Sequence, residues 1–131
     1  MREILFRGKR VKKYCKEQDW TEGVPYIDHE DDCIMATHYS KYVVDPETVG
    51  QYTGLTDKNG KKIFEGDIIK IYLYETKRLA NYETGCIKYD DTKARFVLCT
   101  EEGNYGIDNS NVFEVIGNIH DNPELLKEGG E

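Results

Sequence analysis

Short apolar runs alternate with polar turns along most of the chain, and the apolar positions follow the period of two that is typical of β-strands. The strongest strand signal lies at residues 68–74, where β-branched and aromatic side chains dominate. Residues 85–89 and 94–100 are expected to pair as a hairpin, because the polar stretch 90–93 between them is typical of a turn. No window of about twelve residues repeats apolar positions at helical spacing. The pattern therefore predicts a mainly-β chain with less than about a fifth of its residues in helices.

Two turns are predicted in the middle of the chain. Asn59-Gly60 is a pair that strongly favours a tight hairpin, because both residues tolerate a positive φ. Gly66 and Asp67 stand directly before the strongest strand, and we expect a positive φ or a close backbone approach at this glycine. The Asp67 carboxylate is expected to accept hydrogen bonds from loop amides. The pair is therefore interpreted as a structural turn and not as part of a two-carboxylate site with Glu65.

The chain of 131 residues has a net charge of -7, but the charge is unevenly distributed. Residues 1–16 hold seven Lys and Arg against one acid, whereas residues 17–32 hold seven acids and no base. We interpret the two blocks as facing each other across a hairpin, because solvated charge runs usually serve only solubility. The longest stretch without charge, residues 48–56, is far shorter than the ~20 residues of a membrane helix. Since the charged N-terminus also lacks an apolar signal region, we expect a cytoplasmic protein without membrane contact.

The spacing of cysteine and histidine gives little support for a metal site or a catalytic site. None of the four cysteines forms a Cys-x-x-Cys pair, and disulfides are not expected without a secretory signal. His29, Cys33 and His38 are spaced so that, on a strand, His38 would point away from the other two. No set of nucleophile, base and oxyanion donors can be assembled from the sequence. We therefore expect no metal, no cofactor and no enzymatic activity.

Several stretches of the sequence resemble the YopX protein family, whose members are typical of phages and prophages of Gram-positive bacteria. The most specific is the central block at residues 49–69, which reads VGQYTGLTDKNGKKIFEGDII. The start of the chain also resembles the family, with ILFRGK at residues 4–9 and WTEG at residues 20–23. The end does so with FEVIGNIHDNPELL at residues 113–126. The resemblance thus spans nearly the whole chain.

The resemblance implies a mainly-β fold with an SH3-type barrel or roll in the C-terminal half and a smaller β-rich N-terminal segment. It also implies a protein of a bacterial host cytoplasm, and it brings no catalytic or binding residues with it. We expect one domain, residues 1–131, made of four segments. These are an N-terminal β segment (1–44), a turn-rich connector (45–66), the barrel strands (67–119) and a short helical turn with an acidic tail (120–131).

Two kinds of binding are open for such a protein. Small barrels often bind single-stranded nucleic acid through aromatic side chains and basic residues. The net charge of -7 argues against strong binding of this kind, because phosphates need a contiguous basic face. A tyrosine-rich polar surface favours protein contacts instead, since the tyrosine ring is large, rigid and half polar. We therefore expect a phage-type binding protein that contacts a protein partner or itself. The candidate nucleic-acid contacts of the alternative are Lys70, Lys77, Arg78 and Lys88.

The strand at residues 68–74 also suggests self-association. If alternate residues from position 69 onward face the core, the opposite face presents Ile68, Lys70, Tyr72 and Tyr74. The charged N-terminal segment is expected to cover this half-apolar stripe incompletely. A bare stripe of this kind invites pairing with another subunit. We therefore predict a homo-oligomer with Tyr72 and Tyr74 as interface residues.

Overall fold

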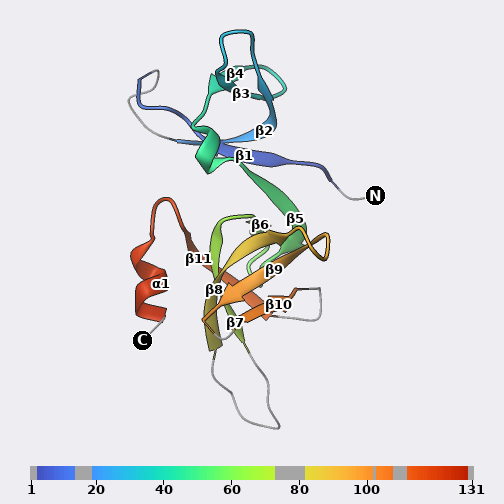
Figure 1. Cartoon of the computed structure of the whole chain (residues 1–131), viewed down its shortest axis with the longest axis vertical. Helices are drawn as coiled ribbons and strands as arrows, with labels where there is room; N and C mark the ends of the chain where they lie inside the picture. Colours follow the sequence, from blue (N-terminus) through green and yellow to red (C-terminus); the bar gives the residue numbers. More distant parts are fainter. Residues whose placement is uncertain (1–2, 14–18, 73–81, 102, 108–111, 130–131) are drawn as a thin grey trace. The chain divides into compact units, whose positions relative to one another are not determined.

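The protein is described by a computed structural model that consists mainly of β-strands (Figure 1). The mainly-β prediction is confirmed, because the described residues form two antiparallel sheets with one short α-helix. Among the described residues, no helix is both long enough and apolar enough to cross a membrane. The chain divides into two compact units, Met1–Tyr52 and Thr53–Glu131. The structure describes residues 3–13, 19–72, 82–101, 103–107 and 112–129.

The first unit is a set of short antiparallel strands that neighbour one another in the order β4-β3-β2-β1-β5. A short 3₁₀ helix, η1, precedes β5. Asp45 caps it by accepting a hydrogen bond from the Glu47 N–H at 3.0 Å, and Pro46 occupies the first helical position. The elements are β1 (Phe6–Lys9), β2 (Trp20–Ile27), β3 (Cys33–Ala36), β4 (Lys41–Val43), η1 (Pro46–Thr48) and β5 (Gly50–Thr56).

The strands of the first unit curl round a small core. Arg10, just beyond β1, forms a bridge with Val44, just beyond β4, although two strands separate β1 from β4 in the sheet order. The Asp45 N–H donates to the Lys9 carbonyl at 2.8 Å in the same region. The core enclosed in this way is small. It consists of Cys33, Met35 and Val44, with Phe6 and Val49 packed against it.

The second unit begins within β5, whose C-terminal part neighbours β6. The stretch that was expected to be a turn-rich connector, residues 45–66, therefore contains strands as well as turns. The further elements are β6 (Lys62–Phe64), β7 (Asp67–Tyr72), β8 (Tyr82–Asp90), β9 (Arg95–Thr100), β10 (Gly103–Gly106), β11 (Val112–Asn118) and α1 (Glu124–Gly129).

Five of these strands form a sheet with the order β10-β9-β8-β7-β11. The predicted hairpin is confirmed, because β8 pairs with β9 in a register that puts Asp90 opposite Arg95. The expected barrel is not closed among the described strands, since β10 and β11 stand at the two ends of the order. All four residues of β10 are exposed, so this strand has no apolar face that would be buried by closure.

One face of this sheet holds the larger core of the protein. Ile69 and Ile71 lie two residues apart on β7 and therefore point to the same side, where Ile87 of β8 meets them. This alternation follows the predicted core positions of the strongest strand. The complete set of buried core residues is Ile63, Ile69, Ile71, Ile87, Leu98 and Phe113.

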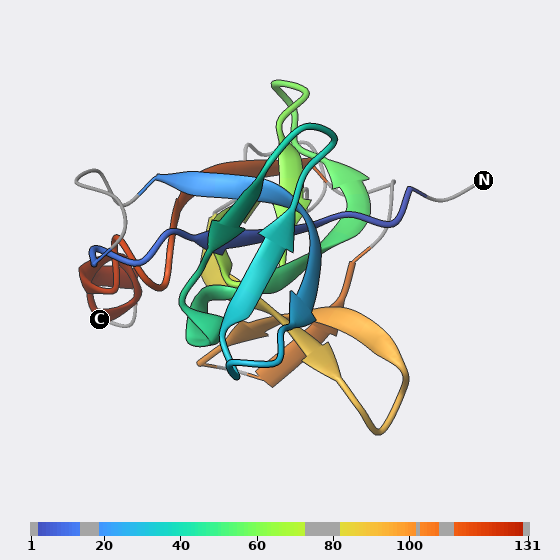
Figure 2. The same cartoon turned by 90° about the horizontal axis from the view of Figure 1, so that it is seen from above.

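The opposite face of the sheet is covered in part by α1. Ile68 points away from Ile69 and is nevertheless fully buried, between Cys86 and Gly117 in the register. Helix α1 packs against β8, and a Cβ atom at Gly117 would lie 2.9 Å from Leu125 Cδ1 (Figure 1 and Figure 2). The prediction that Ile68 is part of an outward stripe is therefore wrong, because the C-terminal helix covers this end of β7.

Candidate interaction surface

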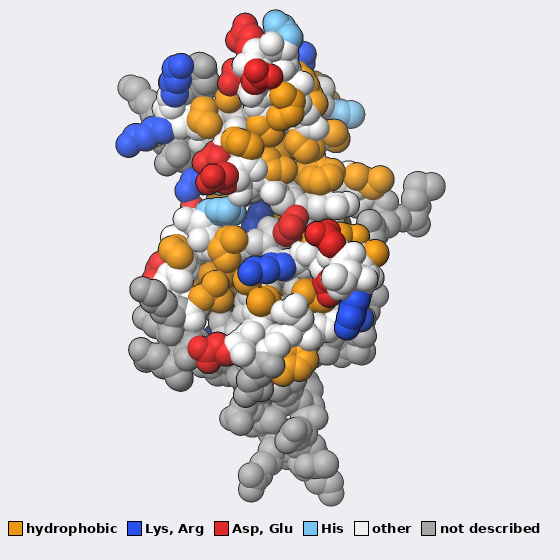
Figure 3. Space-filling view, viewed as in Figure 1, with side chains coloured by type: hydrophobic (Ala, Val, Ile, Leu, Met, Phe, Trp, Pro, Cys, Tyr) orange, Lys and Arg blue, Asp and Glu red, His pale blue; other side chains and the backbone are white. Residues whose placement is uncertain are grey.

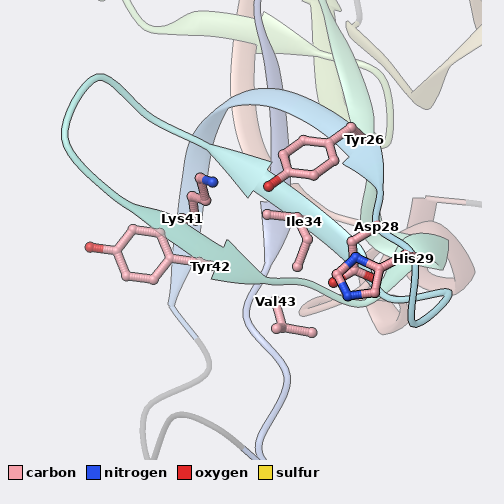
Figure 4. A pocket seen from close by; sticks show the side chains of 7 residues that line it. All are labelled: Tyr26, Asp28, His29, Ile34, Lys41, Tyr42 and Val43. Carbon is pink, nitrogen blue, oxygen red and sulfur yellow. The ribbon is translucent and has the colours of Figure 1, made fainter.

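A pocket of about 460 Å³ opens on the first unit across β2, β3 and β4 (Figure 4). Its apolar wall follows from the strand register, which puts Tyr26 opposite Ile34 and Ile34 opposite Val43. Cross-strand neighbours of this kind share one face of a sheet. Figure 4 shows polar side chains at the two ends, with Asp28 and His29 at one end and Lys41 and Tyr42 at the other.

Further apolar side chains are exposed beside this pocket. Val24 is 56% exposed and Tyr26 is 40% exposed, and both point to the same side of β2 because they lie two residues apart. Ile27, at the end of β2, is 62% exposed. Figure 3 shows hydrophobic side chains gathered over the first unit. Exposed apolar side chains next to a pocket, on a protein with so many charged residues, are typical of an interaction site.

Arginine side chains contact Tyr42, at one end of the pocket, and Trp20 of β2, which does not line it. The Arg10 guanidinium stacks on the Tyr42 ring at 3.7 Å from its centroid, and its Nε donates to Thr21 Oγ1 at 2.8 Å. Arg7 stacks in the same way on Trp20 at 4.6 Å. These contacts restrain the rings before any partner arrives, which lowers the entropy lost on binding. Two arginines of the basic block 1–16 thus have a structural role.

An ordered acidic loop forms one end of the pocket. The Asp28 carboxylate accepts hydrogen bonds from the Glu30 and Asp32 N–H groups, both at 2.9 Å, and this fixes the loop between β2 and β3. Asp31 adopts a positive φ of 65° at its tip. Glu30 and Asp31 are exposed, so the loop adds negative charge next to the apolar wall. Positively charged groups are therefore favoured at this end of the pocket.

The three residues that were considered as metal ligands do not share one environment. Cys33 is buried in the small core, whereas His29 and His38 are exposed. Burial raises the pKa of the Cys33 thiol, and the nearby Asp45 carboxylate raises it further. The described part of the chain holds no group of three metal-ligating side chains. The geometry of these residues is that of a core thiol and two surface imidazoles.

Two of the four candidate nucleic-acid contacts lie within the described residues. Lys70 on β7 stands opposite the acidic residue Glu114 of β11 in the register. Lys88 is exposed and lies near the C-terminal end of β8. The two lysines therefore do not form a contiguous basic patch by themselves. Lys77 and Arg78 lie outside the described residues.

Of the two predicted interface tyrosines, Tyr72 lies within the described residues. The Tyr72 hydroxyl donates to Glu114 Oε1 at 3.0 Å, and the Lys58 ammonium lies 5.0 Å from the centroid of its ring. Lys58 Nζ lies 3.9 Å from Glu114 Oε2. Tyr72 is half-buried and belongs to this intrachain cluster. Tyr74 lies outside the described residues, and an interface through the pair stays a prediction.

The Asn59-Gly60 turn is organised by Asp57, a residue whose role the sequence reasoning missed. Gly60 has the positive φ, 81°, that the turn requires. The buried Asp57 carboxylate accepts hydrogen bonds from Asn59 N–H at 2.8 Å, Lys61 N–H at 2.9 Å and Val115 N–H at 3.0 Å. Burial alone raises the pKa of Asp57, but the three amide bonds outweigh burial and hold the pKa below its ordinary value. Asp57 thus ties the turn to β11.

The Gly66-Asp67 pair forms a second buried turn. Gly66 has a φ of 92°, its N–H donates to the Ile87 carbonyl at 2.8 Å, and its carbonyl accepts from the Ile119 N–H at 2.9 Å. Asp67 is 1% exposed and accepts a hydrogen bond from the Phe64 N–H at 2.8 Å. The Gly66 backbone and the Asp67 carboxylate thus both stabilise the junction of β6 and β7.

These features define the class of the protein as a mainly-β chain of two compact units, each built on antiparallel strands. The family model for the YopX protein matches residues 6–127, and the chain belongs to this family. It is similar to a solved structure, protein EF1440 from Enterococcus faecalis, with 28% sequence identity and a TM-score of 0.59. That similarity covers 96% of this chain and 99% of the other. No curated protein matches the sequence.

Proposed function

We propose that this YopX-family protein is a non-enzymatic binding protein of phage or prophage origin. It acts in the cytoplasm of a bacterial host by binding a protein through its first unit. The observation that carries the proposal is the exposed apolar surface beside the 460 Å³ pocket. We use the name pocket face for the exposed Val24 and Tyr26 together with Ile34 and Val43, which line the pocket.

The chemistry of the pocket face describes the segment that it binds. An apolar side chain of the partner fills the space between Tyr26, Ile34 and Val43. A lysine or arginine of the partner lies next to it, over the exposed acids of the loop that follows β2. A second copy of this chain is one partner of this kind, since residues 1–16 hold five Lys and Arg besides Arg7 and Arg10. Self-association into a homo-oligomer therefore belongs to the proposal.

The second unit serves as the scaffold in this proposal, and we assign it to the SH3-type rolls. Its strand order supports the assignment, because four consecutive strands form a meander and the last strand returns beside the first of them. Many unrelated functions occur on such small folds, so the fold adds no function of its own.

The second candidate function is binding of single-stranded nucleic acid by the β8–β10 region. Tyr89 and Tyr105 favour it, because they are 43% and 41% exposed and offer rings on which bases can stack. Lys88, on the other face of β8, is also exposed. The predicted consequence is a salt-dependent affinity, with a slope of about -0.7 per phosphate contacted. A fluorescence titration of labelled single-stranded DNA and RNA at low salt tests it, and the absence of binding would exclude this candidate.

Affinity capture from the bacterial host tests the protein-binding proposal with two matched tyrosine variants. Tyr26 on the pocket face and Tyr105 on β10 have nearly equal exposure, 40% and 41%. We expect Tyr26→Ser to lose a captured protein that the wild type and Tyr105→Ser retain. Light scattering on the same three proteins reports whether self-association depends on the pocket face. Equal capture and equal mass for all three proteins would contradict the proposal.

A further inference from the structure

Two cysteines face each other across the second sheet. Cys86 on β8 and Cys99 on β9 are directly opposite in the register, next to the core pair Ile87 and Leu98. Directly opposed residues of antiparallel strands have Cα atoms about 4.5–5.5 Å apart, with their side chains on one face. A disulfide needs Cα atoms about 4.4–6.8 Å apart. The backbone therefore holds the two thiols at a separation that one S–S bond can span.

The two thiols differ in exposure. Ile87 and Leu98 point into the core, so Cys86 and Cys99 point to the other face of the sheet. Cys86 is 5% exposed, since it lies on the strand against which α1 packs. Cys99 is only half-buried and pairs with Asn104 on the exposed strand β10. Small molecules in solution therefore reach Cys99 first.

The environment of Cys86 suits the second thiol of such a pair. Burial raises the pKa of Cys86, Lys88 opposes this effect, and Cys99 contributes to the rise by its charge and its hydrogen bond. Cys86 is thus a protected thiol that stays protonated at neutral pH, next to a more accessible one.

We propose that Cys86 and Cys99 form a redox modification site, a reversible cross-strand disulfide made by exchange with a low-molecular-weight disulfide such as oxidised glutathione. This inference is independent of the pocket face, which lies in the other unit. It assigns a reversible disulfide to two cysteines, although the sequence alone predicted none because it shows no secretory signal.

The reaction takes place in two exchange steps. The Cys99 thiolate attacks one sulfur of oxidised glutathione, the glutathione S–S bond breaks, and one glutathione leaves as a thiolate that takes up a proton. Cys86 then loses its proton to solvent and attacks the Cys99 sulfur of the mixed disulfide, and the second glutathione leaves in the same way. The two cysteines lose two electrons in total, and oxidised glutathione gains them. Excess reduced glutathione reverses both steps.

A peptide map of the folded full-length protein tests this assignment. The protein is incubated with oxidised glutathione without denaturant, alkylated and digested with trypsin, which cuts between the cysteines at Lys88, Lys93 and Arg95. We expect a cross-linked pair of peptides that contains Cys86 and Cys99, and a loss of two of the four titratable thiols. Treatment with dithiothreitol should restore both thiols.

Variants separate the roles of the two residues. Cys86→Ser should stop the reaction at a stable mixed disulfide of Cys99 with glutathione, whereas Cys99→Ser should react much more slowly at Cys86. Cys33→Ser is the control, because Cys33 lies in the core of the other unit, and it should leave the cross-link unchanged. Circular dichroism confirms that each variant is folded. A wild-type map without the Cys86–Cys99 cross-link, or with this cross-link at the same yield as other cysteine pairs, would overturn the proposal.

Discussion

The two units use their apolar residues in different ways. Among the described residues, the second unit buries six large side chains in one core cluster, whereas the core cluster of the first unit consists of Cys33, Met35 and Val44. At the same time the first unit leaves Val24 and Ile27 more than half exposed. The first unit adds order through arginine–aromatic stacking in place of a larger core. The difference indicates that the second unit is the stable scaffold and that the first presents the apolar surface.

The largest effect is expected when a buried side chain is removed from each core. This change tests whether the second unit has the more stabilising core. Phe113→Ala should destabilise the second unit by about 3–5 kcal/mol, because a fully buried ring is removed from a close-packed core. Met35→Ala in the first unit should cost about 2 kcal/mol, since fewer neighbours lose contacts there. Urea unfolding followed by circular dichroism measures both losses.

The single tryptophan makes this experiment specific for one unit. Trp20 lies in β2, so its fluorescence reports on the first unit alone. Phe113→Ala should shift the circular dichroism transition further than the Trp20 transition, and Met35→Ala should do the reverse. Identical shifts with both probes would mean that the two units unfold as one cooperative structure, and the comparison would then fail.

The next largest effect concerns Asp57, which ties the Asn59-Gly60 turn to β11. Asp57→Asn should cost about 2–3 kcal/mol, because a neutral amide oxygen cannot accept all three N–H groups with the strength of the carboxylate. Asp90→Asn is the matched control in the β8–β9 turn. The Asp90 carboxylate also accepts from a backbone amide, that of Thr92, but it does so at the surface. The loss at Asp90 should be clearly smaller, and an equal loss would contradict the role of Asp57.

The same residue gives a pH dependence with a definite sign. The pKa of Asp57 is lower in the folded protein than in the unfolded chain, so folding favours the ionised carboxylate. Its contribution to stability is complete above the unfolded value of ~3.9 and is lost as the pH falls through the folded value. The difference in stability between wild type and Asp57→Asn should therefore shrink between pH 5 and pH 3, values chosen about one unit either side of ~3.9. A constant difference, measured by urea unfolding, would show that Asp57 does not act through its charge.

The sequence predicts the strands of the second unit well, because their signals are local. Residues 68–72 alternate toward a core, and the polar stretch 90–93 joins two strands that do pair. The same locality explains the error at Ile68, since periodicity shows that this residue faces away from the core but not that α1 covers it. The open sheet order was also beyond prediction, because closure depends on contacts between strands far apart in sequence.

The pocket face could not be predicted for a similar reason. Tyr26, Ile34 and Val43 come from three strands, and only their register makes them neighbours. Each of these strands contributes only one or two of the residues, so no single stretch looks like a surface site. A sequence signal does exist for Asp57, since an aspartate two residues before Asn-Gly is suited to accept the amides of that turn.

A smaller effect is expected at the turn before β7. Gly66→Ala should cost on the order of 1 kcal/mol, because a non-glycine residue is strained at a φ of 92°. The cost should be conformational only, since the nearest atom to a Cβ at this position, His120 Nε2, would be 3.8 Å away. Gly60→Ala is the control, with a φ of 81° and no atom within 4 Å of the added Cβ. Similar losses in urea unfolding support this account, and a loss confined to Gly66 would point to a steric cause.

The smallest effect on stability is expected on the pocket face itself. Val24 is 56% exposed, so Val24→Ser removes little buried apolar surface and should change the free energy of unfolding by less than about 0.5 kcal/mol. Ile87→Ser, at a fully buried position of the second unit, should by contrast abolish stable folding. If the pocket face is the interaction surface, Val24→Ser should weaken partner capture or self-association while circular dichroism and the unfolding midpoint stay unchanged. A Val24→Ser protein that is destabilised as strongly as a core variant would instead show that the first unit depends on Val24 for its fold, and its apolar surface would no longer be free for a partner.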